Sequence, residues 1–113
     1  MYKSGQWDGK SLLSFPTPTE ADTDVYKLRI KLTLEETFEI LEATLTTAVY
    51  EESFKPLIDA MTAKVEHLQS QHFDVKPVDV YDSLVDQLYV NDGWANLMGF
   101  DMQKGFEEVH SSN

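Results

Sequence analysis

Three glutamates in the run 34–41, Leu-Glu-Glu-Thr-Phe-Glu-Ile-Leu, carry the clearest chemical signal of this chain. At about 100° per residue, Glu35, Glu36 and Glu39 fall within roughly 100° of arc on one side of a helix. Leu32, Ile40 and Ala43 lie on the Glu36 side of that arc, and Leu34, Phe38, Leu41 and Leu45 line the opposite side. A helix that is apolar on two sides is normally enclosed by protein, where unpaired carboxylates cost several kcal/mol each. The pattern therefore predicts a divalent cation held by these glutamates.

A second acidic row lies further along the chain. Asp79, Asp82, Asp86 and Gly93 fall within roughly 60° of one another on a helix. Apolar residues share this stripe, namely Tyr89, Val90 and Leu97, so it does not look like a plainly solvated face. A glycine within a helix costs about 1 kcal/mol relative to alanine, so Gly93 predicts a close approach of another helix or of a ligand.

Two acidic rows on helices that pack side by side could form a cage of oxygen ligands. Mg²⁺ prefers near-octahedral oxygen coordination and usually keeps waters and substrate phosphates among its ligands. The predicted chemistry is metal-assisted hydrolysis of a phosphoanhydride, in which a carboxylate outside the coordination shell takes the proton of the attacking water. The alternative is that these acids belong to solvated helix surfaces, as most acidic pairs on helices do.

Composition limits the classes of partner and compartment. With a net charge of −11, the chain repels nucleic acid and anionic membranes, so we expect it to bind neither. A small polyanionic substrate remains compatible if metal ions supply its counter-charge. The chain has no cysteine, and it lacks both a signal pattern and an apolar run long enough to span a membrane, so we expect a cytoplasmic protein.

The spacing of apolar, proline and glycine residues predicts the elements that carry these acids. Residues 1–18 form an irregular arm, and residues 19–113 form one helical domain. The first helix begins near Thr19 or Asp22 and runs to about Tyr50. A second helix covers about 53–68, a loop covers 70–76, Pro77 opens a third helix that runs to about 98, and a short fourth helix follows the cap Asp101. The class is all-α, a compact four-helix bundle.

The same residues resemble a known family. The run 35–39, Glu-Glu-Thr-Phe-Glu, matches the E-E-x-x-E signature of the MazG-like all-α nucleoside triphosphate pyrophosphohydrolases. The stretch 82–90, followed by Gly93 and Ala95, is similar to their second motif. The segments 99–101 and 106–113 resemble the end of small phage and bacterial members. The resemblance covers roughly residues 16–113.

The resemblance implies a reaction and a set of ligands. With Mg²⁺, or Mn²⁺ in its place, a nucleoside triphosphate and water give a monophosphate and pyrophosphate, as in the house-cleaning of deoxynucleotide pools. Glu36, Glu39 and Asp86 would be metal ligands, and Glu35 would bind a further ion or orient the water as a base. The second motif usually has glutamate where this chain has Ser83, and the substitute is Asp82. Family members usually form homodimers or homotetramers built as dimers of dimers.

Four residues are candidates for substrate binding. Arg29, the only arginine, is either a phosphate contact or a surface residue. Trp94 either stacks on a nucleobase or packs in a core or interface. His110 and Asn113 stand where family members place substrate-contacting polar residues, although a chain end of this kind also frays. Lys27 and Lys31 are either surface residues or phosphate ligands, and no role follows from the pattern for His67 and His72.

Two other functions remain compatible with these features. One is phosphoribosyl-ATP pyrophosphohydrolase, a related helical enzyme of histidine synthesis. The other is a helical dimerisation or metal-binding module without turnover, which Ser83 favours because serine supplies no anionic ligand. Assays with both types of substrate test the first alternative, and phosphate detection with and without magnesium tests the second.

Overall fold

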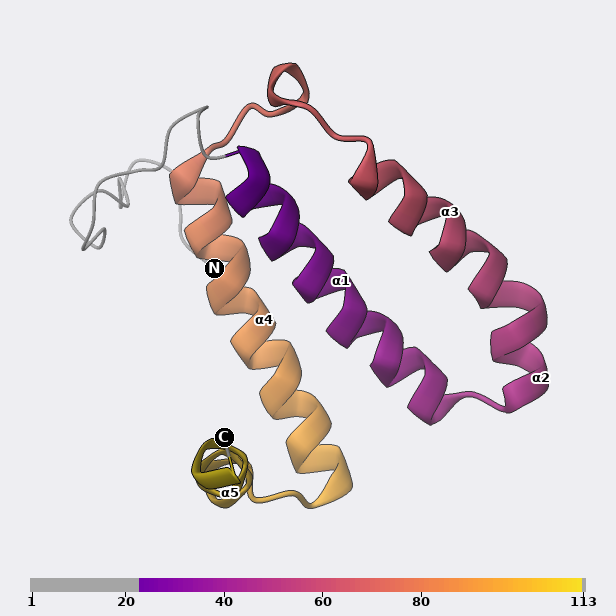
Figure 1. Cartoon of the computed structure of the whole chain (residues 1–113). Helices are drawn as coiled ribbons and strands as arrows, with labels where there is room; N and C mark the ends of the chain where they lie inside the picture. The colour runs from indigo at the N-terminus through magenta and orange to yellow at the C-terminus, as the bar shows by residue number, and fades with distance from the viewer. Residues whose placement is uncertain (1–22, 113) are drawn as a thin grey trace. The chain divides into compact units, whose positions relative to one another are not determined.

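The computed structural model describes residues 23–112, which consist of helices and connections without a strand. This confirms the predicted all-α class. The described residues fall into two units, one ending at Asp74 and the other beginning at Val75 (Figure 1). None of their helices is long and apolar enough to cross a lipid bilayer. The predicted arm, residues 1–18, and Asn113 lie outside the described residues.

In the first unit, α1 (Thr23–Thr44) and α3 (Lys55–Glu66) lie side by side as the arms of a hairpin, with α2 (Thr47–Val49) at the turn (Figure 1). The packing is apolar: Tyr50 and Val65 are buried, with 7% and 8% of their surface exposed. The half-buried apolar side chains of α1 include Leu34, Phe38 and Leu41, and Leu45, directly after the helix, is half-buried too. These four residues form one of the two apolar sides that the sequence predicts for this helix.

The first helix ends earlier than predicted. We expected it to continue to Tyr50, but α1 stops at Thr44 and the backbone of Thr46 is extended, with φ −64° and ψ 151°. The Thr46 hydroxyl accepts a hydrogen bond from the backbone N–H of Val49 at 3.3 Å. Threonine is a favoured N-cap because its side chain satisfies one of the free N–H groups of a new helix. The prediction was wrong because this cap begins a second helix within the expected first one.

The second helix contains a wider turn between α2 and α3. This π-helical segment, η3 (Tyr50–Phe54), closes with a hydrogen bond from the Lys55 N–H to the Tyr50 carbonyl. Pro56 follows directly; in an α-helix its ring would crowd the carbonyl four residues earlier, and it has no N–H to donate. A wider turn relieves that crowding, so the helical backbone continues from Thr47 to Glu66. The predicted start near residue 53 was therefore too late.

Tyr50 is the residue of this unit whose loss should cost most stability. Only 7% of the surface of Tyr50 is exposed, and the residue lies directly after α2, at the turn between the two arms. We expect Tyr50→Ala to lower the free energy of unfolding by about 3 kcal/mol, the usual cost of emptying an aromatic site. Urea denaturation measures this, and Tyr50→Phe, which keeps the ring, should lose less than about 1.5 kcal/mol. Equal losses in both variants would contradict a packing role for the ring.

The connection after α3 is short and ordered by side chains. The loop predicted for residues 70–76 contains one 3₁₀ turn, η4 (Ser70–His72). Next to it, the rings of Tyr26 and Phe73 stack with their centroids 5.6 Å apart and an interplanar angle of 28°. This contact ties the end of the unit to the first turn of α1.

The second unit is built on α4 (Pro77–Met98), whose two ends agree with the sequence analysis. Pro77 occupies the first turn, where a missing N–H costs nothing. At the other end Gly99 has φ 72°, a left-handed conformation that suits glycine. The N–H groups of Gly99 and Phe100 donate to the carbonyls of Asn96 and Ala95 at 3.4 and 2.9 Å. The predicted helix 77–98 and its glycine cap are confirmed.

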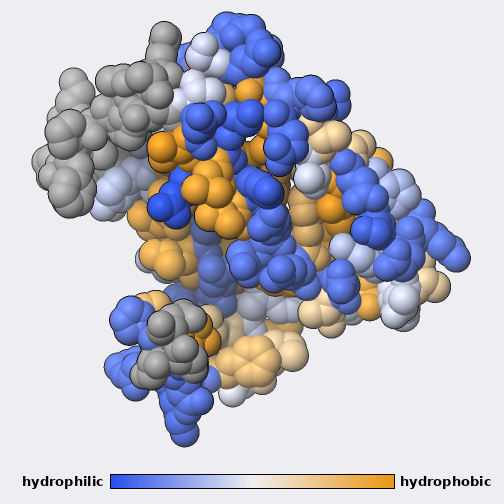
Figure 2. Space-filling model, in the orientation of Figure 1, coloured by the Kyte–Doolittle hydropathy of each residue, from blue (hydrophilic) through white to orange (hydrophobic). Residues whose placement is uncertain are grey.

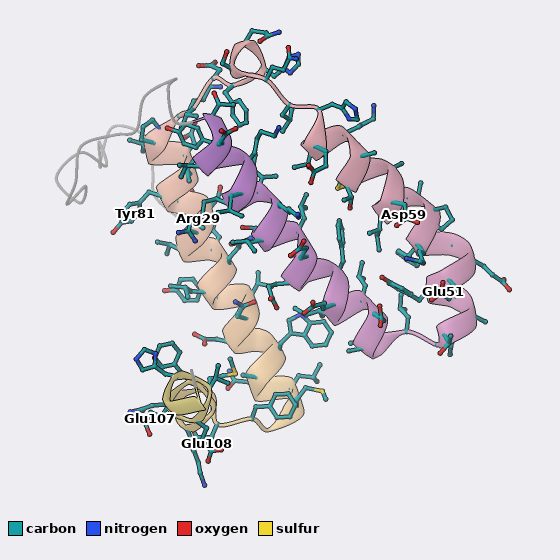
Figure 3. All side chains as sticks on the ribbon, in the orientation of Figure 1. Arg29, Glu51, Asp59, Tyr81, Glu107 and Glu108 are labelled. Carbon is teal, nitrogen blue, oxygen red and sulfur yellow. The ribbon has the colours of Figure 1, made fainter. Side chains whose placement is uncertain are left out.

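The last helix, α5 (Met102–Ser112), begins as predicted at an aspartate cap. The side chain of Asp101 accepts a hydrogen bond from the backbone N–H of Lys104 at 3.0 Å. Phe106 and Val109 are exposed, at 71% and 64%. Glu107 and Glu108 are also exposed and project from α5 in Figure 3.

Candidate metal site

The first acidic row is on the surface of α1. Glu35, Glu36 and Glu39 are exposed, and α1 contains no buried residue. On the other predicted apolar side, Leu32 and Ile40 are exposed at 41% and 39%. The expectation that α1 is enclosed on both sides is therefore wrong for the described residues of the single chain. Only the side of α1 that carries Leu34, Phe38 and Leu41 is partly covered.

The glutamates of this row repel one another. The Glu36 carboxylate is the largest cause that raises the pKa of Glu39 above its ordinary value of 4.5, followed by desolvation and a hydrogen bond between the two side chains. Glu35 and Glu42 raise it further through their charges. A bound cation would relieve this repulsion, because an opposite charge favours the ionised carboxylates.

Glu42 is a member of this row that the sequence analysis did not single out. It follows Glu39 by one turn and lies on the same face as Glu35, so the i, i+4, i+7 spacing was the signal that could have found it. The hydroxyl of Tyr50 is hydrogen bonded to Glu42, and burial is the main cause that raises the pKa of this tyrosine. The row therefore extends towards the buried centre of the hairpin.

The repulsion predicts a pH dependence for the metal-free protein. A raised pKa means that the folded state binds the Glu39 proton more tightly than the unfolded state, so the free energy of unfolding falls as the pH rises from 4.5 through the raised pKa. This contribution is present in full below that range and is lost above it. We expect Glu36→Gln to bring the Glu39 pKa back towards 4.5 and to reduce the loss.

Carboxyl NMR titration of Glu39, with thermal unfolding in chelator at several pH values, measures both effects. Glu52→Gln is the matched control, because Glu52 is exposed in η3 and is not a cause of the shift at Glu39. An unchanged Glu39 pKa in Glu36→Gln would contradict the assignment of Glu36 as the main cause.

The second acidic row, on α4, contains two shielded carboxylate oxygens. Asp82 and Asp86 are half-buried, and one oxygen of each, Oδ1, is inaccessible to water and has no hydrogen-bond partner within the described part of the chain. Buried polar atoms nearly always have a partner, so each orphaned oxygen calls for one. A bound cation would supply it. The exposed Ser83 has no such oxygen, which agrees with Asp82 as its substitute.

The rest of the α4 stripe is open. Tyr89, Val90 and Leu97 are exposed at 68%, 61% and 77%. A Cβ atom added to Gly93 would meet no atom within 4 Å among the described residues. The predicted close approach at Gly93 is therefore wrong for these residues, and Asp79 is exposed as well.

A complete protein cage is not formed by the part of the chain that the structure describes. Within residues 23–112 no three His, Asp or Glu side chains gather closely enough to hold one ion. A Mg²⁺ ion bound by these residues would take waters or phosphate oxygens as its other ligands. The assignment of Glu36, Glu39, Asp82 and Asp86 as its ligands stays a prediction.

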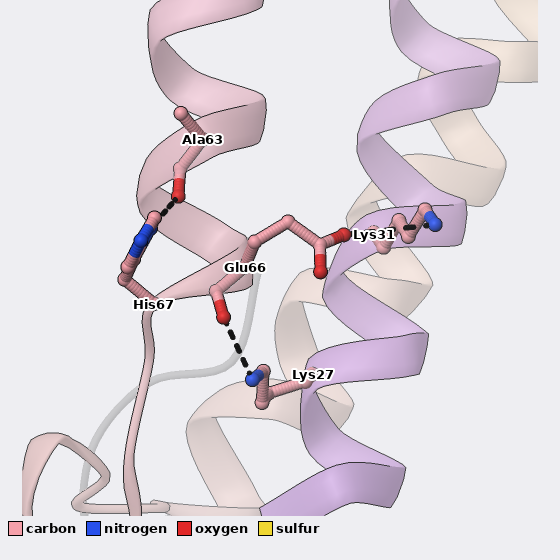
Figure 4. A network of polar contacts seen from close by, with 5 residues as sticks. All are labelled: Lys27, Lys31, Ala63, Glu66 and His67. Atoms are coloured by element: carbon pink, nitrogen blue, oxygen red, sulfur yellow. Dashed lines mark hydrogen bonds and ion pairs between the residues drawn. The ribbon is translucent and has the colours of Figure 1, made fainter.

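The basic residues of α1 divide into two groups. Lys27 Nζ donates to the Glu66 carbonyl at 3.0 Å, and Lys31 Nζ lies 3.7 Å from Glu66 Oε1 (Figure 4). Both lysines therefore join α1 to the end of α3. Arg29 is exposed, and its guanidinium makes no hydrogen bond or ion pair with the described residues (Figure 3). It remains the candidate for a phosphate contact.

The other predicted substrate residues are exposed. Trp94 is 38% exposed. The His110 ring stacks on Phe106 with the centroids 5.7 Å apart and the planes 8° from parallel. Asn113 lies outside the described residues. Their roles in substrate binding stay predictions.

Comparison with known proteins assigns the chain to a family. Residues 12–113 match the family described as phosphoribosyl-ATP pyrophosphohydrolase. The chain belongs to this family. The phosphoribosyl-ATP pyrophosphohydrolase family is part of the all-α nucleotide pyrophosphohydrolase superfamily and hydrolyses phosphoanhydride bonds, which agrees with the predicted enzyme class. Comparisons with curated proteins and with solved structures found no significant match.

Proposed function

We propose that this chain is a Mg²⁺-dependent pyrophosphohydrolase that converts (deoxy)nucleoside triphosphates to monophosphates and pyrophosphate and so clears unwanted nucleotides. The observation that carries the proposal is the pair of orphaned Oδ1 atoms on Asp82 and Asp86. Two anionic oxygens shielded from water and spaced by one helical turn are suited to a divalent cation. The match to a pyrophosphohydrolase family supports the reaction class.

Each acidic row would hold metal, through Glu36 and Glu39 on α1 and through Asp82 and Asp86 on α4. When bound, Mg²⁺ neutralises phosphate charge and lowers the pKa of a coordinated water. Mn²⁺ has the same preference for oxygen ligands and would substitute for it. The mutual repulsion of Glu36 and Glu39 supports this assignment, because a bound cation would relieve the repulsion and this relief would strengthen cation binding.

The remaining groups act on water and on the leaving group. Glu35, next to the ligand row, would orient the attacking water and accept its proton as the bond to phosphorus forms. The bond to the bridging oxygen then breaks, and pyrophosphate leaves with the electron pair. Arg29 would bind the charged phosphates, because its guanidinium has no partner among the described residues. Trp94, His110 and Asn113 would contact the nucleoside.

The partner in solution would be a second copy of this chain, in a homodimer or homotetramer. Large apolar side chains stand exposed on both units, and orange surface is visible in Figure 2. On α1 they include Val25, Leu28, Leu32 and Ile40, on the side that also bears Glu36. Apolar patches of this kind usually mark an interface. A self-association through this side would enclose the glutamates as the sequence analysis expects.

The second candidate is hydrolysis of phosphoribosyl-ATP, which the description of the matched family favours directly. The deciding experiment incubates the protein with canonical and damaged dNTPs and NTPs and with phosphoribosyl-ATP, in magnesium or in chelator. Chromatography identifies the products. Release of monophosphate and pyrophosphate from a nucleoside triphosphate supports the proposal. Turnover confined to phosphoribosyl-ATP favours the second candidate, and no turnover on any substrate favours a non-catalytic module.

A further inference from the structure

A hollow of about 510 Å³ lies at the end of α3, within the unit that ends at Asp74. Its lining consists of five residues: Ala63, Lys64, His67, Leu68 and His72. Glu66, which precedes His67, is bonded to Lys27 at the start of α1. Glu39 comes roughly 18 Å further along α1, at about 1.5 Å per residue. The hollow is therefore separate from the acidic row of this unit.

The first histidine of the hollow has one nitrogen fixed by the backbone. His67 Nδ1 lies 2.7 Å from the Ala63 carbonyl (Figure 4). A carbonyl only accepts hydrogen bonds, so Nδ1 carries the proton and Nε2 of the neutral ring is an acceptor. This bond completes the end of α3, because the carbonyls of Lys64, Val65 and Glu66 accept from His67 N, Leu68 N and Lys27 Nζ at 3.2, 3.2 and 3.0 Å. The orientation of the ring therefore follows from helix capping.

The second histidine, His72, carries its proton on the opposite ring nitrogen. The backbone N–H of Gln69 donates to His72 Nδ1 at 3.1 Å. Nδ1 therefore has no proton, and the neutral ring carries its hydrogen on Nε2 as a donor. The two imidazoles thus offer one acceptor and one donor. A metal ion bridging them would need a lone pair on both Nε2 atoms, so the hydrogen bonds disfavour chelation by this pair.

Two further features add charge and an apolar wall. The Lys64 side chain is exposed, and no hydrogen bond or ion pair of its ammonium is found within residues 23–112. Leu68 is half-buried and, with the methyl group of Ala63, gives the hollow an apolar surface. The hollow has a volume of about 510 Å³ and is shallow and widely open to solvent. Together, the ammonium of Lys64, the apolar surface and the His67 acceptor favour a ligand that has an anionic group, an apolar ring and an N–H donor.

We propose that this hollow binds a nucleoside monophosphate. Lys64 Nζ and His72 Nε2–H donate to the phosphate oxygens. His67 Nε2 accepts an N–H of the base, whose face contacts Leu68 and Ala63. The choice of nucleotide rests on the proposed function, whose product belongs to this class. Product bound here would occupy a site apart from the acidic row and would not compete for its metal.

The test follows imidazole NMR signals of the isotope-labelled full chain, in chelator, with adenosine monophosphate as the probe. We expect saturable shifts at His67 and His72. Adenosine and inorganic phosphate, each lacking half of the contacts, should bind at least about tenfold more weakly. Lys64→Gln should weaken binding of the monophosphate about tenfold, since it removes a charged donor. Lys55→Gln is the matched control, because Lys55 is exposed and pairs with Asp59 away from the hollow.

The same spectra test the hydrogen-bond assignment without a ligand. Long-range nitrogen–proton correlations should place the proton on Nδ1 of His67 and on Nε2 of His72. Four outcomes overturn the proposal: the Nδ1–H form at His72, no saturable shift, equal affinity for inorganic phosphate (an adventitious ion only), or full affinity in Lys64→Gln. Because no turnover is measured, such a failure leaves the hydrolytic reaction untouched, and loss of hydrolysis would not remove binding here.

Discussion

Glutamine in place of Glu39 should reduce magnesium-dependent release of pyrophosphate by about 10²–10³-fold, the usual loss when one preorganised electrostatic group of an active site is removed. Glu39 is the member of the α1 row on which the charges of Glu35, Glu36 and Glu42 converge. Its carboxylate therefore gains most from a bound cation. Product chromatography measures the rate, and circular dichroism checks that helicity is retained.

The control for this variant is Glu52→Gln. It makes the same chemical change on an exposed helical residue of the same unit and should leave the rate within about twofold, as expected of a site outside the catalytic groups. Activity that persists in Glu39→Gln with normal magnesium dependence would remove the α1 row from the mechanism. A loss of helicity would instead point to folding, and Glu39→Asp, which keeps the charge, should then recover the structure but only part of the rate.

Asparagine in place of Asp86 should have effects of opposite sign on activity and stability. Hydrolysis should fall about 10²–10³-fold if Asp86 is the metal ligand that we propose. The metal-free protein should gain about 1 kcal/mol, because a shielded anionic oxygen that has no hydrogen-bond partner among residues 23–112 is replaced by a neutral amide. That gain corresponds to roughly 4 °C in the melting temperature of a domain of this size. Product chromatography measures the rate of hydrolysis, and thermal unfolding in chelator measures the stability.

Magnesium should raise the melting temperature of the natural protein more than that of Asp86→Asn, since a ligand stabilises the state that binds it. The matched control is Asp92→Asn, an exposed position on the same helix without an orphaned oxygen. Destabilisation of the metal-free Asp86→Asn protein, with its activity intact, would mean that the Asp86 oxygen has a structural partner instead of a metal.

The helices with local end signals could be predicted closely from the sequence. Pro77, Gly99 and Asp101 set the limits of α4 and α5 through backbone chemistry that needs no tertiary contact. The break at Thr46 was missed because a threonine within an apolar pattern is also compatible with a continuous helix. The π-helical turn was missed because it depends on how the helix adapts to a proline after it has formed.

The two acidic rows could also be predicted from the spacing of the acids along the sequence. Whether other residues cover these acids could not be predicted in this way. Helical periodicity places Glu36 and Glu39 together, yet it does not say whether a neighbour covers them, and in the described residues they are exposed. The orphaned oxygens of Asp82 and Asp86 and the contact of Tyr50 with Glu42 depend on side-chain packing. The two histidines near η4 had no pattern at all, because their roles come from backbone groups of nearby residues.

The π-helical turn before Pro56 takes up one residue more than an α turn without changing the register of α3. Deleting a single residue within Tyr50–Phe54 would therefore restore an ordinary turn and leave the residues beyond it on nearly the same faces. Val65 would stay buried and Glu66 would stay beside Lys27, and the main cost would be the crowding of the Pro56 ring against the carbonyl four residues earlier. A deletion within the regular part of α3 would instead rotate everything beyond it by about 100°, so variation in length should be tolerated better in this segment than in the rest of the helix.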